Sequence, residues 1–307
     1  MIVAMVSRNP GELPAWVEQA IAAAGIHLRC RRCADEEELI AVAADAEVVW
    51  CCGPNRCVTA AALKRLPRCR ALFRSGSGLD SIPVDAAHAL GIAVHNTPES
   101  IAESVAEHAV ALLLALVRQV TVQDRRVREG RWADSEPMQR WHLSRRCLGL
   151  VGFGQIARLV EKMLRGFDLR VLHHDPFSAQ SIPLADLLRQ ADCVSLHCPL
   201  TAETRQMIGA AELALMKPGA LLVNTARGAV IDEAALVAAL RSGHLGGAAL
   251  DVLAQEPPAS DNPLLALDNV ILSPHIAAFS ADFERNFWQG SINKLKALCS
   301  ISSSPCR

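Results

Sequence analysis

The sequence predicts an α/β protein with two domains built on parallel sheets, and three observations lead to that prediction. Short apolar runs alternate with segments of helical periodicity along the whole chain, a pattern typical of parallel strands covered by helices. The length of 307 residues exceeds the size at which a single hydrophobic core usually keeps growing. The polar stretch Asn96-Thr97-Pro98 has the character of a crossing between domains.

The N-terminal third of the chain predicts the first sheet. Helical stretches at residues 12–24 and 59–66 lie between its short apolar runs. Apolar positions between Phe279 and Leu295 also have helical spacing. We expect this last helix to return to the first domain, which has little other helical cover. The strands expected here are Ile2–Val6, Val48–Cys52, Ala71–Ser75 and Ala93–Asn96.

The middle of the chain predicts a second sheet. A long buried helix is expected to begin at Ser100, because apolar residues continue at helical spacing through Val117. We therefore expect a Rossmann-like domain at 98–279, inserted into a flavodoxin-like or Rossmann-like domain made of 1–97 and 280–307, with the site between them. The strands of the domain at 98–279 are predicted at Leu148–Val151, Arg170–His174, Cys193–His197, Ala220–Asn224, Ala249–Val252 and Val270–Leu272.

Composition argues against several classes of protein. A formal net charge of −1 gives no electrostatic reason to expect a nucleic-acid partner. The apolar run at the N-terminus has no basic region before it and is too short for a signal peptide. The longest apolar stretch, Ala109 to Val117, is far shorter than the roughly 20 residues that span a bilayer. We expect a cytoplasmic protein that is not bound to a membrane.

The 11 cysteines are scattered along the chain, which favours reduced thiols that serve as small core residues. Cys30 and Cys33 have the spacing of zinc ligands, but no second pair of similar form completes a set of four. No metal site is predicted.

A glycine-rich motif carries the strongest functional signal. Gly152 and Gly154 follow an apolar run and open a helical pattern, and Ala157 lies in its first turn. Such a turn lets a backbone approach a pyrophosphate at a helix N-terminus. Asp175 stands 21 positions after Gly154, where a carboxylate can bond ribose hydroxyls and repel a 2′-phosphate. This pattern predicts NAD binding, although His173 and its neighbour His174, if protonated, would soften that repulsion.

Three polar residues follow successive predicted strands of the second domain: Arg227, Glu256 and His275. Strand ends on one side of a parallel sheet converge, so the three can meet near a cofactor. Arginine can hold a carboxylate or carbonyl oxygen, and imidazole supported by a carboxylate can exchange a proton. These types suit hydride transfer involving a small hydroxy acid. Taken singly, each residue could equally be a surface, turn or structural polar group.

Eight motifs occur in order between about residues 45 and 280. They are Arg74-Ser-Gly76-Ser-Gly78-Leu-Asp80, Ser104-Val-Ala-Glu107, Gly152-Phe-Gly154-Gln-Ile-Ala157, His197-Cys-Pro199-Leu-Thr201, Met216-Lys-Pro-Gly-Ala, Asn224-Thr-Ala-Arg227-Gly228, Asp251-Val-Leu-Ala-Gln-Glu256-Pro257 and Ser273-Pro-His275-Ile-Ala277. Together they resemble the D-isomer-specific 2-hydroxyacid dehydrogenase family, which includes glyoxylate or hydroxypyruvate reductases and D-3-phosphoglycerate dehydrogenases.

The resemblance implies specific roles for these residues. Arg227 resembles the substrate-binding arginine, Glu256 the carboxylate that supports the catalytic histidine, and His275 the group that exchanges a proton with substrate. The loop Ser75, Gly76, Ser77 and Gly78 resembles the segment whose amides hold the substrate carboxylate. The cofactor positions implied are Gly152, Gly154, Gln155, Ile156, Ala157, Asp175, Cys198, Pro199, Thr204, Thr225, Ala226, Asp251 and His275, with Asp251 positioning the nicotinamide amide.

The resulting prediction is an NAD-dependent oxidoreductase that transfers a hydride between nicotinamide and C2 of a small (R)-2-hydroxy acid or 2-keto acid. The resemblance also favours a homodimer, with the long helix from Ser100 as a plausible interface. Two alternatives stay open. One is an NADH-sensing binding protein, similar to the family's co-repressors, with little or no turnover. The other is a dinucleotide-dependent enzyme that acts on an amino acid or a sugar.

Overall fold

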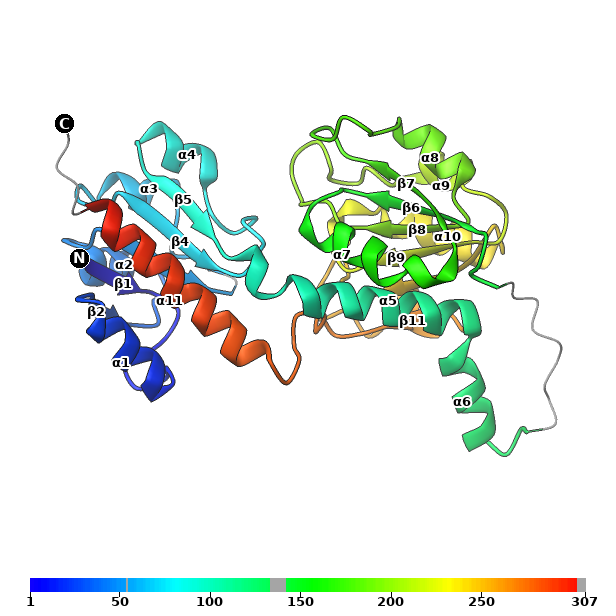
Figure 1. Cartoon of the computed structure of the whole chain (residues 1–307), viewed down its shortest axis with the longest axis horizontal. Helices are drawn as coiled ribbons and strands as arrows, with labels where there is room; N and C mark the ends of the chain where they lie inside the picture. Colours follow the sequence, from blue (N-terminus) through cyan, green and yellow to red (C-terminus); the bar gives the residue numbers. More distant parts are fainter. Residues whose placement is uncertain (54, 133–141, 303–307) are drawn as a thin grey trace. The chain divides into compact units, whose positions relative to one another are not determined.

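The computed structural model describes residues 1–53, 55–132 and 142–302, and these form two compact units (Figure 1). Unit 1 comprises Met1–Ile101 and Ser280–Arg307, and unit 2 comprises Ala102–Phe279. The division falls after Ile101, whereas the sequence placed it after residue 97. The intervening 3-10 helix η1, Pro98–Ser100, packs within unit 1, where the Ser100 Cβ lies 3.0 Å from the position a Cβ on Gly290 would take.

Unit 1 contains a five-stranded parallel sheet in the order β2-β1-β3-β4-β5. The predicted strands are present, but the sequence missed the edge strand β2. Its residues are exposed or half-buried, so it lacks the apolar run by which the other strands were found. The strands are β1 Ile2–Met5, β2 His27–Cys30, β3 Val48–Cys52, β4 Ala71–Ser75 and β5 Ala93–Asn96.

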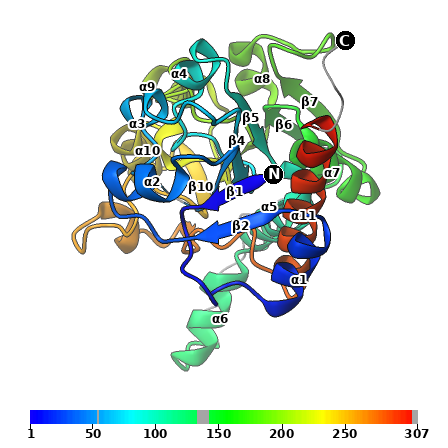
Figure 2. The same cartoon turned by 90° about the vertical axis from the view of Figure 1, so that its left-hand side faces the viewer.

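Helices cover both faces of the unit 1 sheet. On one face, α1 and α11 pack around the buried rings of Trp50, Phe73 and Trp288, and Figure 2 shows these two helices together. The final helix begins at Phe283, and Phe279 lies before it, 63% exposed. Leu39 and Leu63 belong to the core on the other face. The helices are α1 Ala15–Ala23, α2 Glu36–Ala43, α3 Ala60–Lys64, α4 Val84–Ala89 and α11 Phe283–Ser302.

Unit 2 contains a six-stranded parallel sheet in the order β11-β10-β9-β8-β6-β7. β10 begins four residues earlier than expected, at Leu245, because Gly246 and Gly247 interrupt the apolar run. The strands are β6 Cys147–Val151, β7 Arg170–His174, β8 Cys193–Leu196, β9 Ala220–Asn224, β10 Leu245–Leu250 and β11 Val270–Leu272. Their carboxyl ends share one edge because all neighbouring pairs are parallel.

The helices of unit 2 form a layer on each face of this sheet. Leu113 of α5 and Val160 of α7 belong to one core, and Leu187 of α8 and Leu236 of α10 belong to the opposite one. The helices are α5 Ala102–Arg118, α6 Val120–Arg128, α7 Gln155–Met163, α8 Leu184–Gln190, α9 Ala210–Leu215 and α10 Glu233–Arg241. Among the described residues no single helix has the length and apolar composition to cross a membrane. Only α5 and α6 taken together reach that length and composition, and the two are bent by 62° at the break between them.

Candidate active site

The glycine-rich turn after β6 leaves room for a ligand at the start of α7. Gly152 has φ +84°, and a Cβ there would lie 2.7 Å from the Cys198 backbone nitrogen. Only glycine therefore lets this turn pass the end of β8. No atom lies within 4 Å of the Cβ position of Gly154, which caps α7, and Ala157 is fully buried. The predicted residues Gln155 and Ile156 form the first turn of that nine-residue helix, whose free amides suit a diphosphate.

Asp175, just beyond β7, faces this turn. One carboxylate oxygen accepts a hydrogen bond from the Phe153 backbone N–H at 2.7 Å, and the other accepts from the Phe177 N–H at 2.8 Å. Each carboxylate oxygen has a further lone pair that can accept from a ribose hydroxyl. The structure thus holds the predicted acidic group beside the glycine-rich turn.

His173 does not supply the positive charge that would offset Asp175. Its ring stacks on Phe153 with centroids 3.8 Å apart, and its Nε2 lies 2.7 Å from Ser178 Oγ. Burial, with the nearby Arg158 cation, lowers the pKa of His173, so this side chain is neutral near pH 7. In His174, the ring nitrogen Nδ1 lies within hydrogen-bond distance, 2.9 Å, of the Ile182 carbonyl oxygen.

The remaining predicted cofactor residues follow β8 and β9. Thr225 Oγ1 is buried without a hydrogen-bond partner among the described residues, so a polar ligand group could satisfy it. Thr204 instead shapes its own loop, because its hydroxyl donates to the Pro199 carbonyl at 2.6 Å. Burial raises the pKa of Cys198 to about 11, and this residue is a neutral thiol. Together with the glycine-rich turn and Asp175, these groups fit a nicotinamide dinucleotide.

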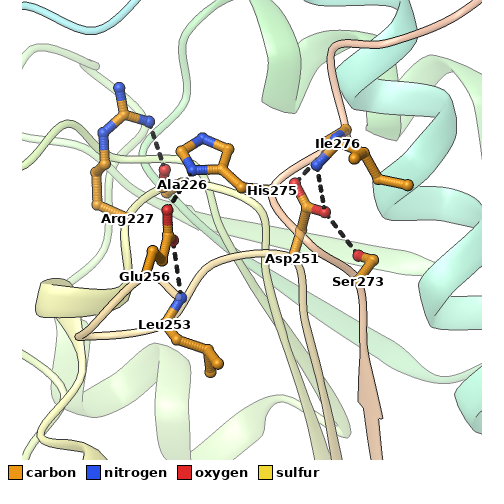
Figure 3. Close-up of polar contacts among 9 residues, drawn as sticks. Ala226, Arg227, Asp251, Leu253, Glu256, Ser273, His275 and Ile276 are labelled. Atoms are coloured by element: carbon orange, nitrogen blue, oxygen red, sulfur yellow. Dashed lines mark hydrogen bonds and ion pairs between the residues drawn. The ribbon is translucent and has the colours of Figure 1, made fainter. Parts of the chain in front are cut away.

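His275 and Glu256 form a direct pair (Figure 3). His275 Nδ1 lies 2.6 Å from one carboxylate oxygen of Glu256, and the other oxygen accepts from the Leu253 N–H at 3.0 Å. The carboxylate holds Nδ1 as the donor, which leaves Nε2 free to exchange a proton. The His275 side chain is 47% exposed, so this nitrogen is accessible to a ligand.

Asp251 holds the unusual backbone of His275, whose φ is +54°. The His275 N–H donates to the Asp251 carbonyl at 2.8 Å. The Asp251 carboxylate accepts from the N–H groups of Ile276 and Ala277 at 3.0 and 2.9 Å and from Ser273 Oγ at 2.6 Å. Asp251 is 1% exposed. Its carboxylate, for which the family resemblance implies a role in positioning the nicotinamide, is largely committed to the turn that presents His275.

His108 joins this arrangement and was missed from the sequence. Its Nε2 lies 3.0 Å from Ser273 Oγ and 3.5 Å from Asp251. The signal that could have found it is a polar residue between Val105 and Leu112 on the buried stripe of α5.

Arg227 is brought to the same edge by the loop after β9. The fully buried Asn224 donates through Nδ2 to the Arg227 carbonyl and accepts from the Ala226 N–H, both at 2.9 Å. A Cβ on Gly228 would lie only 1.9 Å from the Leu253 carbonyl carbon, so this loop is in backbone contact with the loop that bears Glu256. The structure therefore brings the three predicted catalytic residues to neighbouring strand ends of unit 2.

The predicted substrate loop, Ser75 to Gly78, follows β4 in unit 1. Gly76 is already paired within that unit, because its N–H donates to Thr97 Oγ1 at 2.9 Å and its carbonyl accepts from the Thr97 N–H at 3.0 Å. The amide of Gly76 is therefore not available to a substrate carboxylate. Among the predicted amides in this loop, those of Ser77 and Gly78 remain the candidates.

No group of three or more His, Cys, Asp or Glu side chains suited to a metal occurs within residues 1–53, 55–132 and 142–302. The cysteines in these ranges are all free thiols.

Comparison with known proteins identifies relatives. Residues 110–277 match the NAD binding domain of the D-isomer specific 2-hydroxyacid dehydrogenases. The chain is 42% identical over 235 residues to the glyoxylate reductase of Korarchaeum cryptofilum, covering 73% of this chain and 71% of that protein. It is 38% identical over 238 residues to the D-3-phosphoglycerate dehydrogenase of Archaeoglobus fulgidus, covering 75% and 45%.

A solved structure shares the complete fold. The acyclic imino acid reductase solved with NADPH and D-Arg superimposes with a TM-score of 0.88 at 28% identity, covering 98% of this chain and 97% of that chain.

Proposed function

This chain belongs to the D-isomer specific 2-hydroxyacid dehydrogenase family, and we propose that it transfers a hydride between NAD and C2 of a small (R)-2-hydroxy acid or the matching 2-keto acid. The observation that carries the proposal is the 2.6 Å pair of His275 and Glu256, held next to the Arg227 loop. When bound, the nicotinamide supplies or accepts the hydride.

His275 is the acid and base of the proposed reaction. In reduction, its Nε2 donates a proton to the substrate oxygen, and in oxidation the same nitrogen takes the proton from the hydroxyl. Glu256 keeps the ring in the required tautomer through Nδ1. The Arg227 guanidinium binds the substrate's carboxylate or carbonyl oxygen, for which its planar fork is suited. The amides of Ser77 and Gly78 bind the substrate carboxylate in this proposal.

NAD rather than NADP is the proposed cofactor. Asp175 places a negative charge beside the glycine-rich turn that would repel a 2′-phosphate, and the neutral His173 does not offset it. Gly152, Gly154 and the first turn of α7 would hold the diphosphate. Thr225, whose hydroxyl has no hydrogen-bond partner among the described residues, would bind a polar group at the nicotinamide end of the cofactor, and Asp251 would act there through the turn that presents His275.

The decisive assay follows loss of NADH absorbance with glyoxylate, hydroxypyruvate, pyruvate, phenylpyruvate and phosphohydroxypyruvate. We expect turnover of at least one acid by the wild type and its loss in His275→Ala, with NADH binding retained. Full activity of the His275→Ala variant would contradict the assignment. NADH binding without turnover, together with a partner that binds only when NADH is present, would favour the NADH-sensing alternative.

Reduction of acyclic imino acids is a second candidate, supported by the likeness to the imino acid reductase. The same chemistry applies if His275 donates its proton to nitrogen rather than to oxygen. Adding ammonia or a primary amine to each keto acid distinguishes the two. A rate that depends on the amine would favour the imino acid, and a rate independent of it favours the hydroxy-acid reaction.

We infer that a second copy of this chain is the partner of unit 2. The helix from Ser100, which the sequence offered as the interface, is α5, and its Leu112, Leu113 and Leu116 belong to the core of unit 2, so the exposed α6 that follows it is the proposed contact. None of the residues of α6 is buried, and Val120, Val127 and Trp132 are 54%, 48% and 78% exposed. Apolar side chains gathered on such a helix and its following turn suit a symmetric interface. Light scattering during size-exclusion chromatography should give a dimer, and Trp132→Glu should shift it towards the monomer. A monomeric wild type would contradict the proposal.

A further inference from the structure

A chain of buried hydrogen bonds connects the substrate loop to α11. Trp50 Nε1 lies 2.8 Å from Ser75 Oγ, and Ser75 Oγ lies 2.7 Å from Ser291 Oγ. Ser291 Oγ in turn lies 2.7 Å from the carbonyl of Phe287, one turn earlier in α11. The side chains of Trp50, Ser75 and Ser291 belong to residues that are 0% exposed, so water cannot replace a missing member.

The two groups at the ends of this series of hydrogen bonds fix which group donates at each step. The indole N–H can only donate and the Phe287 carbonyl can only accept. Ser291 therefore donates to the carbonyl, and Ser75 donates to Ser291 while it accepts from Trp50. The hydroxyl of Ser75 is fully used inside unit 1, and its role there is to fix the residue from which the loop starts.

The next residue of the loop is hydrogen-bonded to Thr97, which contacts the same helix α11. Gly76 exchanges two hydrogen bonds with Thr97, and Gly290 of α11 packs against Thr97 and Ser100, with its Cβ position 3.9 and 3.0 Å from their Cβ atoms. Thr97 precedes the point at which the chain leaves unit 1 after Ile101, and α11 follows the point at which it returns at Ser280. The start of the loop is thus hydrogen-bonded to Thr97, shortly before the chain leaves unit 1, and to Ser291 of α11, after the chain has returned.

From these contacts we propose that Ser291 and Trp50 are positioning residues for substrate binding, acting through Ser75 on the amides of Ser77 and Gly78. This inference rests on the proposed function for the identity of the ligand. The loop is a short stretch of backbone whose amides must be aimed at one carboxylate. Loss of the Ser291 hydroxyl leaves the Ser75 proton without its oxygen acceptor in a dry site, where the neighbouring Cys52 thiol is only a weak substitute, and the loop must shift to compensate.

The test compares Ser291→Ala with Ser300→Ala. Ser300 makes the same kind of bond, from Oγ to the carbonyl four residues earlier, but it lies exposed on the same helix. We expect Ser291→Ala to raise the KM for the keto acid about tenfold, the size of one lost buried hydrogen bond. The value of kcat and the Kd of NADH should stay within twofold of wild type, roughly the precision with which such effects resolve. Ser300→Ala should change none of these quantities.

Two further measurements separate positioning from a general loss of stability. Amide hydrogen exchange of the segment 74–79, without ligand, should quicken in Ser291→Ala and not in Ser300→Ala. In a double-mutant cycle, Ser291→Ala should add little to the KM of Ser75→Ala, because both remove the same bond. Additive effects, an unchanged KM, or an equal fall in NADH affinity would each overturn the inference. A wild type that turns over none of the acids would overturn the proposed function instead, while loop exchange would still show whether the serine pair fixes the loop.

Discussion

Gly228 and Leu253 lie so close that a Cβ on the glycine would sit 1.9 Å from the Leu253 carbonyl carbon and 2.0 Å from its oxygen. This backbone contact joins the loop that bears Arg227 to the loop that bears Glu256. A separation this short leaves no space for any side chain, and the neighbouring atoms are backbone that cannot rotate away.

Gly228→Ala should therefore separate the two loops and reduce kcat/KM by at least about tenfold, since misplaced catalytic groups are costly. Steady-state kinetics with the best keto acid measure the effect. Gly166→Ala is the matched control, because no atom lies within 4 Å of its Cβ position. Equal activity of the two variants would show that the contact does not matter.

Asp251→Asn should weaken the turn that presents His275. An asparagine can still accept from Ser273 and Ile276, but its NH2 group would then face the Ala277 N–H. Two opposed donors in a buried site cost about 1–3 kcal/mol of unfolding free energy. Urea unfolding measures this loss, and kcat should fall with it. The exposed Asp186→Asn is the control, and equal stability of both variants would rule out the buttressing role.

Asp175→Asn should shift cofactor preference towards NADPH. The amide oxygen can accept from only one of the two backbone N–H groups, those of Phe153 and Phe177, but the substitution removes the charge that repels a 2′-phosphate. We expect the ratio of kcat/KM values for NADPH and NADH to rise by about tenfold, which is roughly 1.4 kcal/mol. Michaelis constants for both cofactors give this ratio. An unchanged ratio would mean that the charge of Asp175 does not set cofactor choice.

His197 should make the protein less stable in mild acid. Desolvation lowers its pKa from 6.5 to about 4, so between these values the unfolded state binds a proton that the folded state refuses. Above pH 6.5 the histidine is neutral in both states and does not lower the free energy of unfolding. As the pH falls from 6.5 towards 4, protonation of the unfolded state lowers the free energy of unfolding progressively.

The resulting loss in the free energy of unfolding is at most about 3 kcal/mol, and solvent access to the ring makes it smaller. Urea midpoints at pH 7 and 5 measure it, and His197→Gln should flatten the difference between them. A variant with the same pH dependence as wild type would assign the effect to other groups.

The fold class and the order of the chemical groups could be predicted from the sequence because both follow from local patterns. Alternating apolar runs and helical periodicity predicted parallel strands, and the family motifs indicated Arg227, Glu256 and His275. The edge strand β2 could not be found in this way. Its residues are too exposed to form an apolar run, and it is defined by its pairing with β1.

By itself, the sequence determined which residues carry charge, protons and glycine flexibility, since these are properties of the residue and its neighbours in the chain. Tertiary structure decided which groups are free to act. Asp251 and Gly76 have their hydrogen-bonding capacity taken up by the turn after β11 and by Thr97, while His108 reaches Ser273 from 165 positions away. A buried hydrogen bond depends on which segments pack together, and that is settled only when the whole core forms.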